Sequence, residues 1–278
     1  MQILLLLLVV LSSPAMAWPN KPVRLLVPVA AGGGADQIAR ILARHMDQQF
    51  GQPVIVDNRG GAGGAVAFNV LLAAPADGHT MLLMSNGEQE EILKRNPLIE
   101  LQTVARMPVT LSVVSALNLA DLDSLLLYAR RNPGRLHYGT GGVGSVLHVA
   151  AQEFERMYTL QLNHVPYKGG AQAILPMLSG ETQVLFMGIG PMLGYRQNDR
   201  IRILAIAGQG RSALAPEIAT FAEQGSGFNF HIWYALVTNQ GVPAQARHRL
   251  IEAVRSVDSN EYTKLGATKW TVTRTNTR

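Results

Sequence analysis

The sequence predicts an α/β protein built from two units of similar design, on three observations. Strand-like and helix-like segments alternate along almost the whole chain. Glycine-rich turns lie between a strand and a helix at two distant places, residues 27–36 and 139–145. The composition is 47% hydrophobic and 15% charged over 278 residues, which is typical of folded domains with a sizeable core.

The first unit is a βαβαβ pattern, which forms a parallel sheet with helices on both faces. We expect strands over 23–28, 53–58 and 79–86, with helices over 37–46 and 65–74 between them. Residues 87–107 are polar, and we expect them to be irregular. Residues 108–115 then predict a strand that leaves the first sheet.

The second unit repeats the alternation. Its expected strands are 136–139, 161–167, 182–188 and 201–207. Its expected helices are 121–131, 145–157 and 170–180. A long strand over 230–238 is suited to cross back to the first unit, and 243–257 predicts an amphipathic helix with Pro243 near its start. The Thr-rich end, 268–278, shows no helical stripe.

The N-terminus has the features of a secretory signal. The apolar run over 3–11 is too short to span a membrane comfortably, and Ala15-Met16-Ala17 is an A-x-A cleavage site. We therefore expect residues 1–17 to be removed and the mature, soluble chain to begin at Trp18. No Lys or Arg precedes the apolar run, so only the α-amino group supplies the positive charge expected there.

Composition excludes several functions. The chain has no cysteine, which excludes thiol catalysis, disulfides and thiolate metal sites. Its net charge of +5 is dispersed, which argues against a nucleic-acid interface and favours small anionic ligands. The seven histidines show no metal-binding spacing, so we expect neither a metal nor a cofactor.

The glycine-rich turns do not match the phosphate-loop pattern, because no lysine follows Gly34 or Gly64 at the required spacing. Residues 139–144 do read G-x-G-x-x-G, but the acidic residue expected about 20 positions on is absent. A nicotinamide-dependent oxidoreductase is therefore a weak alternative. Ser145 is not on a G-x-S-x-G nucleophile elbow and is better interpreted as a helix N-cap.

Both turns are expected to open helices, whose N-termini present backbone N–H groups and a positive dipole end. Together they form a site suited to a carboxylate. His148 either lies on the helix surface or faces the ligand cleft. Asp36 either caps its own helix or accepts hydrogen bonds from a ligand or an ordered water.

Five ordered segments (KPVRLLVPVAAGGGADQIARILARHM, GQPVIVDNRGGAGG, APADGHTMLLM, NPGRLHYGTGGVGSVLHVAAQEF and HVPYKGGAQAILPMLSGETQVLF) resemble the periplasmic solute receptors of the tripartite tricarboxylate transporter, also called Bug-type receptors. The resemblance covers roughly residues 18–257. It implies a two-domain Venus-flytrap fold, type II-like, with a mainly parallel sheet in each domain. The domains would be 18–115 with 230–278, and 116–229.

The resemblance also implies that loop backbone groups of both domains, partly through ordered waters, hold a carboxylate. Carried over to this chain, with the ends of the predicted strands, the ligand-binding candidates are Val29, Ala30, Gly32, Gly33, Gly34, Asp36, Ser85, Asn86, Gly141, Gly144, Ser145, His148, Tyr167 and Met187. The family usually has an aromatic residue at Val29 and often Asp at Met187, so the pocket would be wider and less suited to amine-bearing ligands.

The leading hypothesis is a monomeric, non-enzymatic periplasmic receptor that delivers a small organic carboxylate to membrane transporter subunits or to a sensor. The oxidoreductase is one alternative. The other is a degraded receptor without a ligand, because the family's C-terminal helices are replaced here by the Thr-rich tail.

Overall fold

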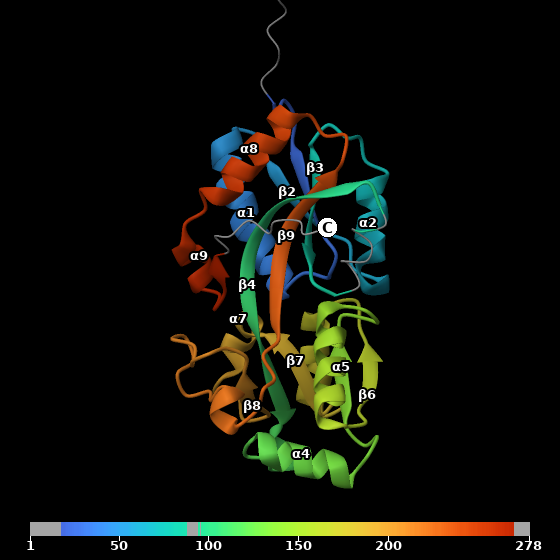
Figure 1. The fold of residues 1–278 in the computed structure, drawn as a ribbon, viewed down its shortest axis with the longest axis vertical. Coiled ribbons are helices and arrows are strands. Elements are labelled where there is room, and N and C mark those ends of the chain that lie inside the picture. The colour runs from blue at the N-terminus through green and yellow to red at the C-terminus, as the bar shows by residue number, and fades with distance from the viewer. Residues whose placement is uncertain (1–17, 88–93, 95, 270–278) are drawn as a thin grey trace, which may run out of the picture.

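The computed structural model describes residues 18–87, 94 and 96–269, which fold into two lobes stacked along the long axis of the molecule (Figure 1). Two long strands, β4 (Leu98–Val114) and β9 (His231–Asn239), run between the lobes. The fold is therefore the expected two-domain α/β architecture. Its sheet is mixed rather than mainly parallel, because β4 and β9 pair antiparallel with each of their neighbours. The residues assigned to a signal, 1–17, lie outside the described residues.

The first lobe has a parallel core in the strand order β2-β1-β3, joined to β9 by antiparallel pairing of β3. Helices α1 and α2 lie on its two sides (Figure 1). Its N-terminal elements are β1 (Val23–Val27), α1 (Gly34–Phe50), β2 (Val54–Asn58), the short 3₁₀ helix η1 (Ala62–Gly64), α2 (Ala65–Leu72) and β3 (Thr80–Ser85). These match the predicted βαβαβ pattern.

The C-terminal elements return to this lobe and pack beside α1 and β4. They are α8 (Ala244–Arg255), α9 (Ser259–Thr263) and β10 (Thr268–Lys269). Pro243 is the N-cap of α8, as expected from its position. The start of the Thr-rich segment is a strand, because Thr268 pairs with Arg106 of β4; the rest of that segment, 270–278, lies outside the described residues.

In the second lobe β5 pairs in parallel with β6 and β7, and β4 pairs antiparallel with β7 and β8. The elements are the 3₁₀ helix η2 (Ser115–Leu117), α4 (Leu122–Arg131), β5 (His137–Thr140), α5 (Val146–Tyr158), β6 (Asn163–Pro166), η3 (Gly170–Ala173), α6 (Ile174–Ser179), β7 (Val184–Gly188), α7 (Ile189–Met192), η4 (Leu193–Tyr195), β8 (Ile201–Ile206) and η5 (Ala222–Gln224). The expected helix over 170–180 is divided into η3 and α6. Pro176 then falls in the first turn of α6, where a missing N–H is tolerated.

The expectation of irregular structure over 87–107 is wrong from Leu98 onward, where β4 begins. Register shifts between Glu100 and Gln102, and again between Thr103 and Ala105, disrupt the alternation of buried and exposed residues that identifies a strand. Residues 88–93 and 95 lie outside the described residues.

The lobes meet at a hinge where β4 leaves the pairing with β9 and β10 and enters the pairing with β7 and β8. Pro108 is paired there with His231. Proline has no N–H for the strand ladder, so the pairing is weakest where the chain passes between lobes. No helix within the described ranges is long and apolar enough to cross a membrane.

Candidate functional site

The lobes touch away from the hinge along a line of backbone contacts. The Ala30 N–H donates to the carbonyl oxygen of Lys168 at 3.3 Å, joining the turn after β1 to the turn after β6. A Cβ at Gly60 would lie 2.5 Å from that oxygen and 2.9 Å from the Ala30 nitrogen. A Cβ at Gly169 would also lie 2.9 Å from the Ala30 nitrogen. Glycine is therefore required for the lobes to come this close.

The same line continues toward α5. A Cβ at Gly87 would lie 3.2 Å from the carbonyl oxygen of Gly144, and one at Gly142 would lie 3.7 Å from the nitrogen of Gly63. We call this line of contacts the interlobe seam. It comprises residues 29–34, 60–63 and 87 of the first lobe and residues 141–144 and 168–171 of the second.

The N-terminus of α1 lies at the seam with no side-chain cap on its N-cap residue, Gly33. A Cβ at Gly33 would meet no atom within 4 Å, whereas one at Gly34 would lie 2.8 Å from the Tyr234 hydroxyl oxygen. The helix start therefore has open space beside Gly33 and the β9 tyrosine beside Gly34. This end of α1 carries the positive end of the helix dipole.

Asp36 anchors the turn before α1. Its carboxylate is buried and accepts hydrogen bonds from the Gly32 N–H at 3.0 Å, from Asn58 at 3.1 Å and from Arg40 at 2.9 Å. Burial alone would raise the pKa of Asp36, but the bonds from Arg40, Gly32 and Asn58 outweigh it and lower that pKa below its ordinary value. The expectation that Asp36 caps its own helix is wrong, because the N-cap of α1 is Gly33 with no side-chain cap bond. Its contacts instead fix the preceding loop, and a hydrogen bond to a ligand stays a prediction.

The second glycine turn is held by side chains of α5. Ser145 is the N-cap of α5 and accepts from the His148 N–H, which confirms the expected cap. The Gly144 N–H donates to Nδ1 of His148 at 3.0 Å. His148 is half-buried, neither fully exposed nor enclosed, and its ring supports the turn from the helix side.

His164, on β6, also supports the glycine turn before α5, through a contact with Thr140. Its Nε2 lies 2.6 Å from Oγ1 of Thr140, and that oxygen also accepts from the Gly142 N–H at 3.2 Å. The ring stacks on His148 at a centroid distance of 4.1 Å and on Tyr138 at 5.1 Å. Burial, together with the nearby His148, lowers the pKa of His164 to about 4, so the ring is neutral at pH 7.

Other candidates occupy less direct positions. Both ends of the Asn86 amide bond the β9 backbone, at His231 O and Trp233 N, while Ser85 is buried at the end of β3. The Tyr167 hydroxyl donates to Glu181 at 3.1 Å. Met187 is buried with its sulfur near Gly170, and a Cβ at Gly141 would lie 3.2 Å from the Gly170 nitrogen.

An open groove of about 900 Å³ lies at the mouth of the seam, between η1 and the turns after β5 and β6. Lys168 is the one charged residue among those that line it, and Tyr167 is the one ligand-binding candidate among them. The lining residues are Gly61, Ala62, Gly63, Gly142, Val143, Pro166, Tyr167, Lys168 and Gln172. A cationic side chain beside backbone-lined turns is suited to a small anion.

The sequence reasoning missed Gly60, Gly170, Thr140 and His164 as site-forming residues. Gly60 and Gly170 belong to Gly-Gly pairs that lie within a few residues of strand ends, and this spacing was the available signal. Nothing in the sequence indicated that His164 would reach Thr140, because residues 24 positions apart meet here only through the β5–β6 pairing.

The fold and this seam define a solute-binding receptor of two lobes that closes around its ligand. A family model described as "Tripartite tricarboxylate transporter family receptor" matches residues 38–269, and the chain belongs to that family. Its members are periplasmic binding proteins, a receptor class rather than an enzyme class, and they work with transporter components.

Protein BugT of Bordetella pertussis is 30% identical over 238 residues, covering 82% of this chain and 73% of BugT. The solved structure of R. palustris Rpa4515 with adipate has a TM-score of 0.85 at 25% identity and covers 92% of this chain and 91% of that one. MatC from Rhodopseudomonas palustris with bound malate has a TM-score of 0.83 at 25% identity, covering 90% of both chains.

Family membership does not favour the oxidoreductase or the degraded receptor.

Proposed function

We propose that this chain binds a small organic carboxylate between its lobes and delivers it to the membrane subunits of a tripartite tricarboxylate-type transporter or to a sensor. One observation carries the proposal. The Ala30 N–H of the first lobe donates to the Lys168 carbonyl of the second, beside the glycine turns that precede α1 and α5. Adipate and malate, bound to the two R. palustris proteins, are both dicarboxylates.

The turns recognise the carboxylate through backbone N–H groups and the positive ends of two helix dipoles. Glycines let the backbone approach the ligand closely, and Lys168 adds a full charge at the mouth of the groove. Binding energy then favours the closed arrangement, in which both lobes contact the ligand at once. No catalysis, cofactor or metal is required for this function.

Selectivity follows from the residues that differ from the family pattern. Val29 and Ala30 are small, so their side of the site accommodates a wider ligand. Met187 is buried and carries no charge to pair with an ammonium group, which disfavours amino acids. Oxygen-rich or aliphatic acids without an amine are the better candidates.

We propose further that residues 1–17 direct export and are cleaved, leaving a monomer in the periplasm. Trp18, the proposed first residue, is already anchored in the fold. Its indole N–H donates to the Asp77 carbonyl at 3.0 Å, and its ring packs against Phe50 and His79.

A thermal-shift screen of the exported chain tests the proposal. The panel contains malate, adipate, citrate, benzoate, amino acids and NAD. A ligand at 100 times its dissociation constant stabilises a protein by about 2.7 kcal/mol, which moves the midpoint by several degrees. We expect at least one carboxylate to raise the midpoint. A rise with NAD and with no carboxylate would overturn the proposal.

A further inference from the structure

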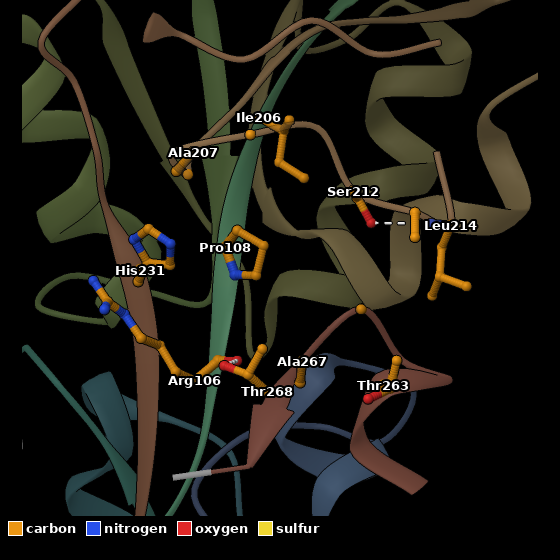
Figure 2. A pocket seen from close by; sticks show the side chains of 14 residues that line it. Arg106, Pro108, Ile206, Ala207, Ser212, Leu214, His231, Thr263, Ala267 and Thr268 are labelled. Atoms are coloured by element: carbon orange, nitrogen blue, oxygen red, sulfur yellow. Dashed lines mark hydrogen bonds between the residues drawn. The ribbon is translucent and has the colours of Figure 1, made fainter. Parts of the chain in front are cut away.

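A second cavity, of about 320 Å³, lies at the hinge (Figure 2). It shares no lining residue with the open groove at the mouth of the interlobe seam. We call it the hinge pocket, and it is lined by Arg106, Pro108, Ile206, Ala207, Gly208, Gly210, Ser212, Ala213, Leu214, His231, Thr263, Gly266, Ala267 and Thr268.

The walls of the hinge pocket come from three parts of the molecule. Arg106, Pro108 and His231 belong to the hinge strands β4 and β9. The turn after β8, residues 207–214, belongs to the second lobe, and the α9–β10 segment, residues 263–268, belongs to the first lobe. Any molecule in this pocket therefore touches both lobes, and the shape of the pocket depends on the angle between them.

The charge in the pocket is one-sided. Arg106 and His231 lie side by side along one wall, and none of the fourteen lining residues is acidic (Figure 2). Within the described part of the chain, the Arg106 guanidinium has no ion-pair partner and no hydrogen bond. Burial, with a further contribution from Arg106, lowers the pKa of His231. The pocket therefore holds an arginine charge that nothing in its walls neutralises.

The rest of the lining is apolar or internally bonded. Pro108 lies in the middle of the view in Figure 2, with the apolar side chains of Ile206 and Leu214 above and to its right. Two of the hydroxyl groups bond within the walls: Ser212 accepts from the Leu214 N–H at 3.3 Å, and Thr263 donates to Ser259 O at 3.1 Å. An apolar body with one anionic group complements this surface.

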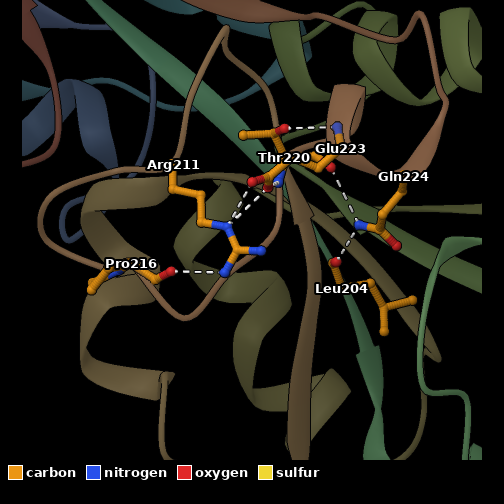
Figure 3. Close-up of polar contacts among 6 residues, drawn as sticks. All are labelled: Leu204, Arg211, Pro216, Thr220, Glu223 and Gln224. Carbon is orange, nitrogen blue, oxygen red and sulfur yellow. Dashed lines mark hydrogen bonds and ion pairs between the residues drawn. The ribbon is translucent and has the colours of Figure 1, made fainter.

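The second-lobe wall is rigidly built. Arg211 pairs with both carboxylate oxygens of Glu223 at 2.9 Å and donates to the Pro216 carbonyl at 3.0 Å (Figure 3). Glu223 also accepts from the Thr220 N–H, and Gln224 ties the segment to the Leu204 carbonyl of β8. A preformed wall lowers the entropy cost of binding.

We propose that the hinge pocket is a second binding site, for a small organic monoanion with an apolar body, with Arg106 as its charged contact. Because the occupant touches both lobes, its binding is coupled to lobe closure, and the coupling with the cleft ligand is reciprocal. The proposal of a binding site in the hinge pocket does not depend on the proposed function. Only the coupling between this site and the cleft rests on that function.

Benzoate is the probe and benzamide its neutral counterpart. Both are titrated into the exported chain without cleft ligand while backbone amide shifts are recorded. We expect benzoate to shift the amides of Gly208, Gly210 and Gly266, and benzamide to bind at least about tenfold more weakly.

The variants are Arg106→Gln and Arg106→Lys. The Arg106 side chain has no hydrogen bond or ion pair to lose among the residues that the structure describes, so both variants should fold, which their amide spectra would verify. We expect Arg106→Gln to weaken benzoate binding about tenfold and Arg106→Lys to retain most of it. The proposal is overturned if benzoate leaves these amides unmoved, moves only those at 29–34 and 141–144, or binds Arg106→Gln as tightly as the original chain.

Discussion

The backbone N–H of Ala30 donates to the carbonyl oxygen of Lys168 across the two lobes, at 3.3 Å. No side chain takes part in this bond. The close approach depends on glycine at positions 60 and 169, where a Cβ would fall inside contact distance of the same atoms. The close approach of the two lobes is thus permitted by the absence of side chains at these positions.

The first prediction is that Gly169→Ala prevents closure. Its Cβ would lie 2.9 Å from the Ala30 nitrogen of the other lobe, and φ at Gly169 is 180°, an extended value that alanine adopts. We expect carboxylate affinity to fall at least about tenfold while the melting temperature of the free protein changes little. Calorimetric titration and a melt measure both quantities.

Gly227→Ala is the matched control, because a Cβ there meets no atom within 4 Å and Gly227 lies away from the seam. Gly33→Trp, in contrast, would fill the open space beside α1 and should weaken binding without blocking the seam. Equal affinity in Gly169→Ala and the original chain would contradict the role of the seam in closure.

The order of the elements could be predicted from the sequence because each lobe alternates clear strands and helices. β4 could not, because its bulges at Glu100–Gln102 and Thr103–Ala105 break the period of two. Its buried polar residue Gln102 is bonded by Arg255 at 3.1 Å, a partner 153 positions away that no local pattern indicates.

The second prediction concerns acid sensitivity at Asp36. Its pKa is lowered in the folded protein, so its contribution to stability is present above the unfolded value of 3.8 and is lost as pH falls through the folded value. Asp36→Asn should destabilise the protein by about 2 kcal/mol at pH 7, with the difference shrinking below about pH 4.

Urea unfolding at several pH values measures this effect, and the exposed Asp123→Asn on α4 serves as control. A difference between Asp36→Asn and the original chain that stays constant from pH 7 to pH 3 would count against a charged Asp36 bonded to Arg40.

The third prediction is that His164 positions the second glycine turn through Thr140. His164→Phe keeps the ring stack but removes Nε2, and Thr140→Val removes the hydroxyl that bonds it at 2.6 Å. His164→Phe should weaken carboxylate binding about fivefold, and Thr140→Val at least as much, because it also loses the bond to Gly142. The double variant should lose no more than Thr140→Val alone. His164→Gln should restore affinity, and additive losses would rule out the shared hydrogen bond.

The fourth prediction follows from the pKa of His164, about 4 when folded against 6.5 for an ordinary histidine. A depressed folded value means that the stability contribution is complete above the unfolded value and falls between pH 6.5 and 4. The melting temperature should therefore drop more steeply across this window in the original chain than in His164→Phe. Identical slopes would show that the ring is not held neutral.

At the site, the glycine turns and Ser145 were predictable because their chemistry is local: a turn followed by a helix start. The residues that those turns contact could not be predicted from the sequence. Gly144 depends on His148 one helical turn away, but Thr140 depends on His164 across a strand pair, and Ala30 depends on Lys168 across the lobes. Such contacts exist only once the fold has formed.

The central claim, a carboxylate held between the lobes, is tested most directly by amide shifts. The best ligand of the thermal screen is titrated while the backbone resonances of Gly32, Gly33, Gly142 and Gly144 are followed. We expect amides of both lobes to shift together and to saturate at one ligand per chain. Shifts confined to one lobe, or absent from all four glycines, would contradict the account.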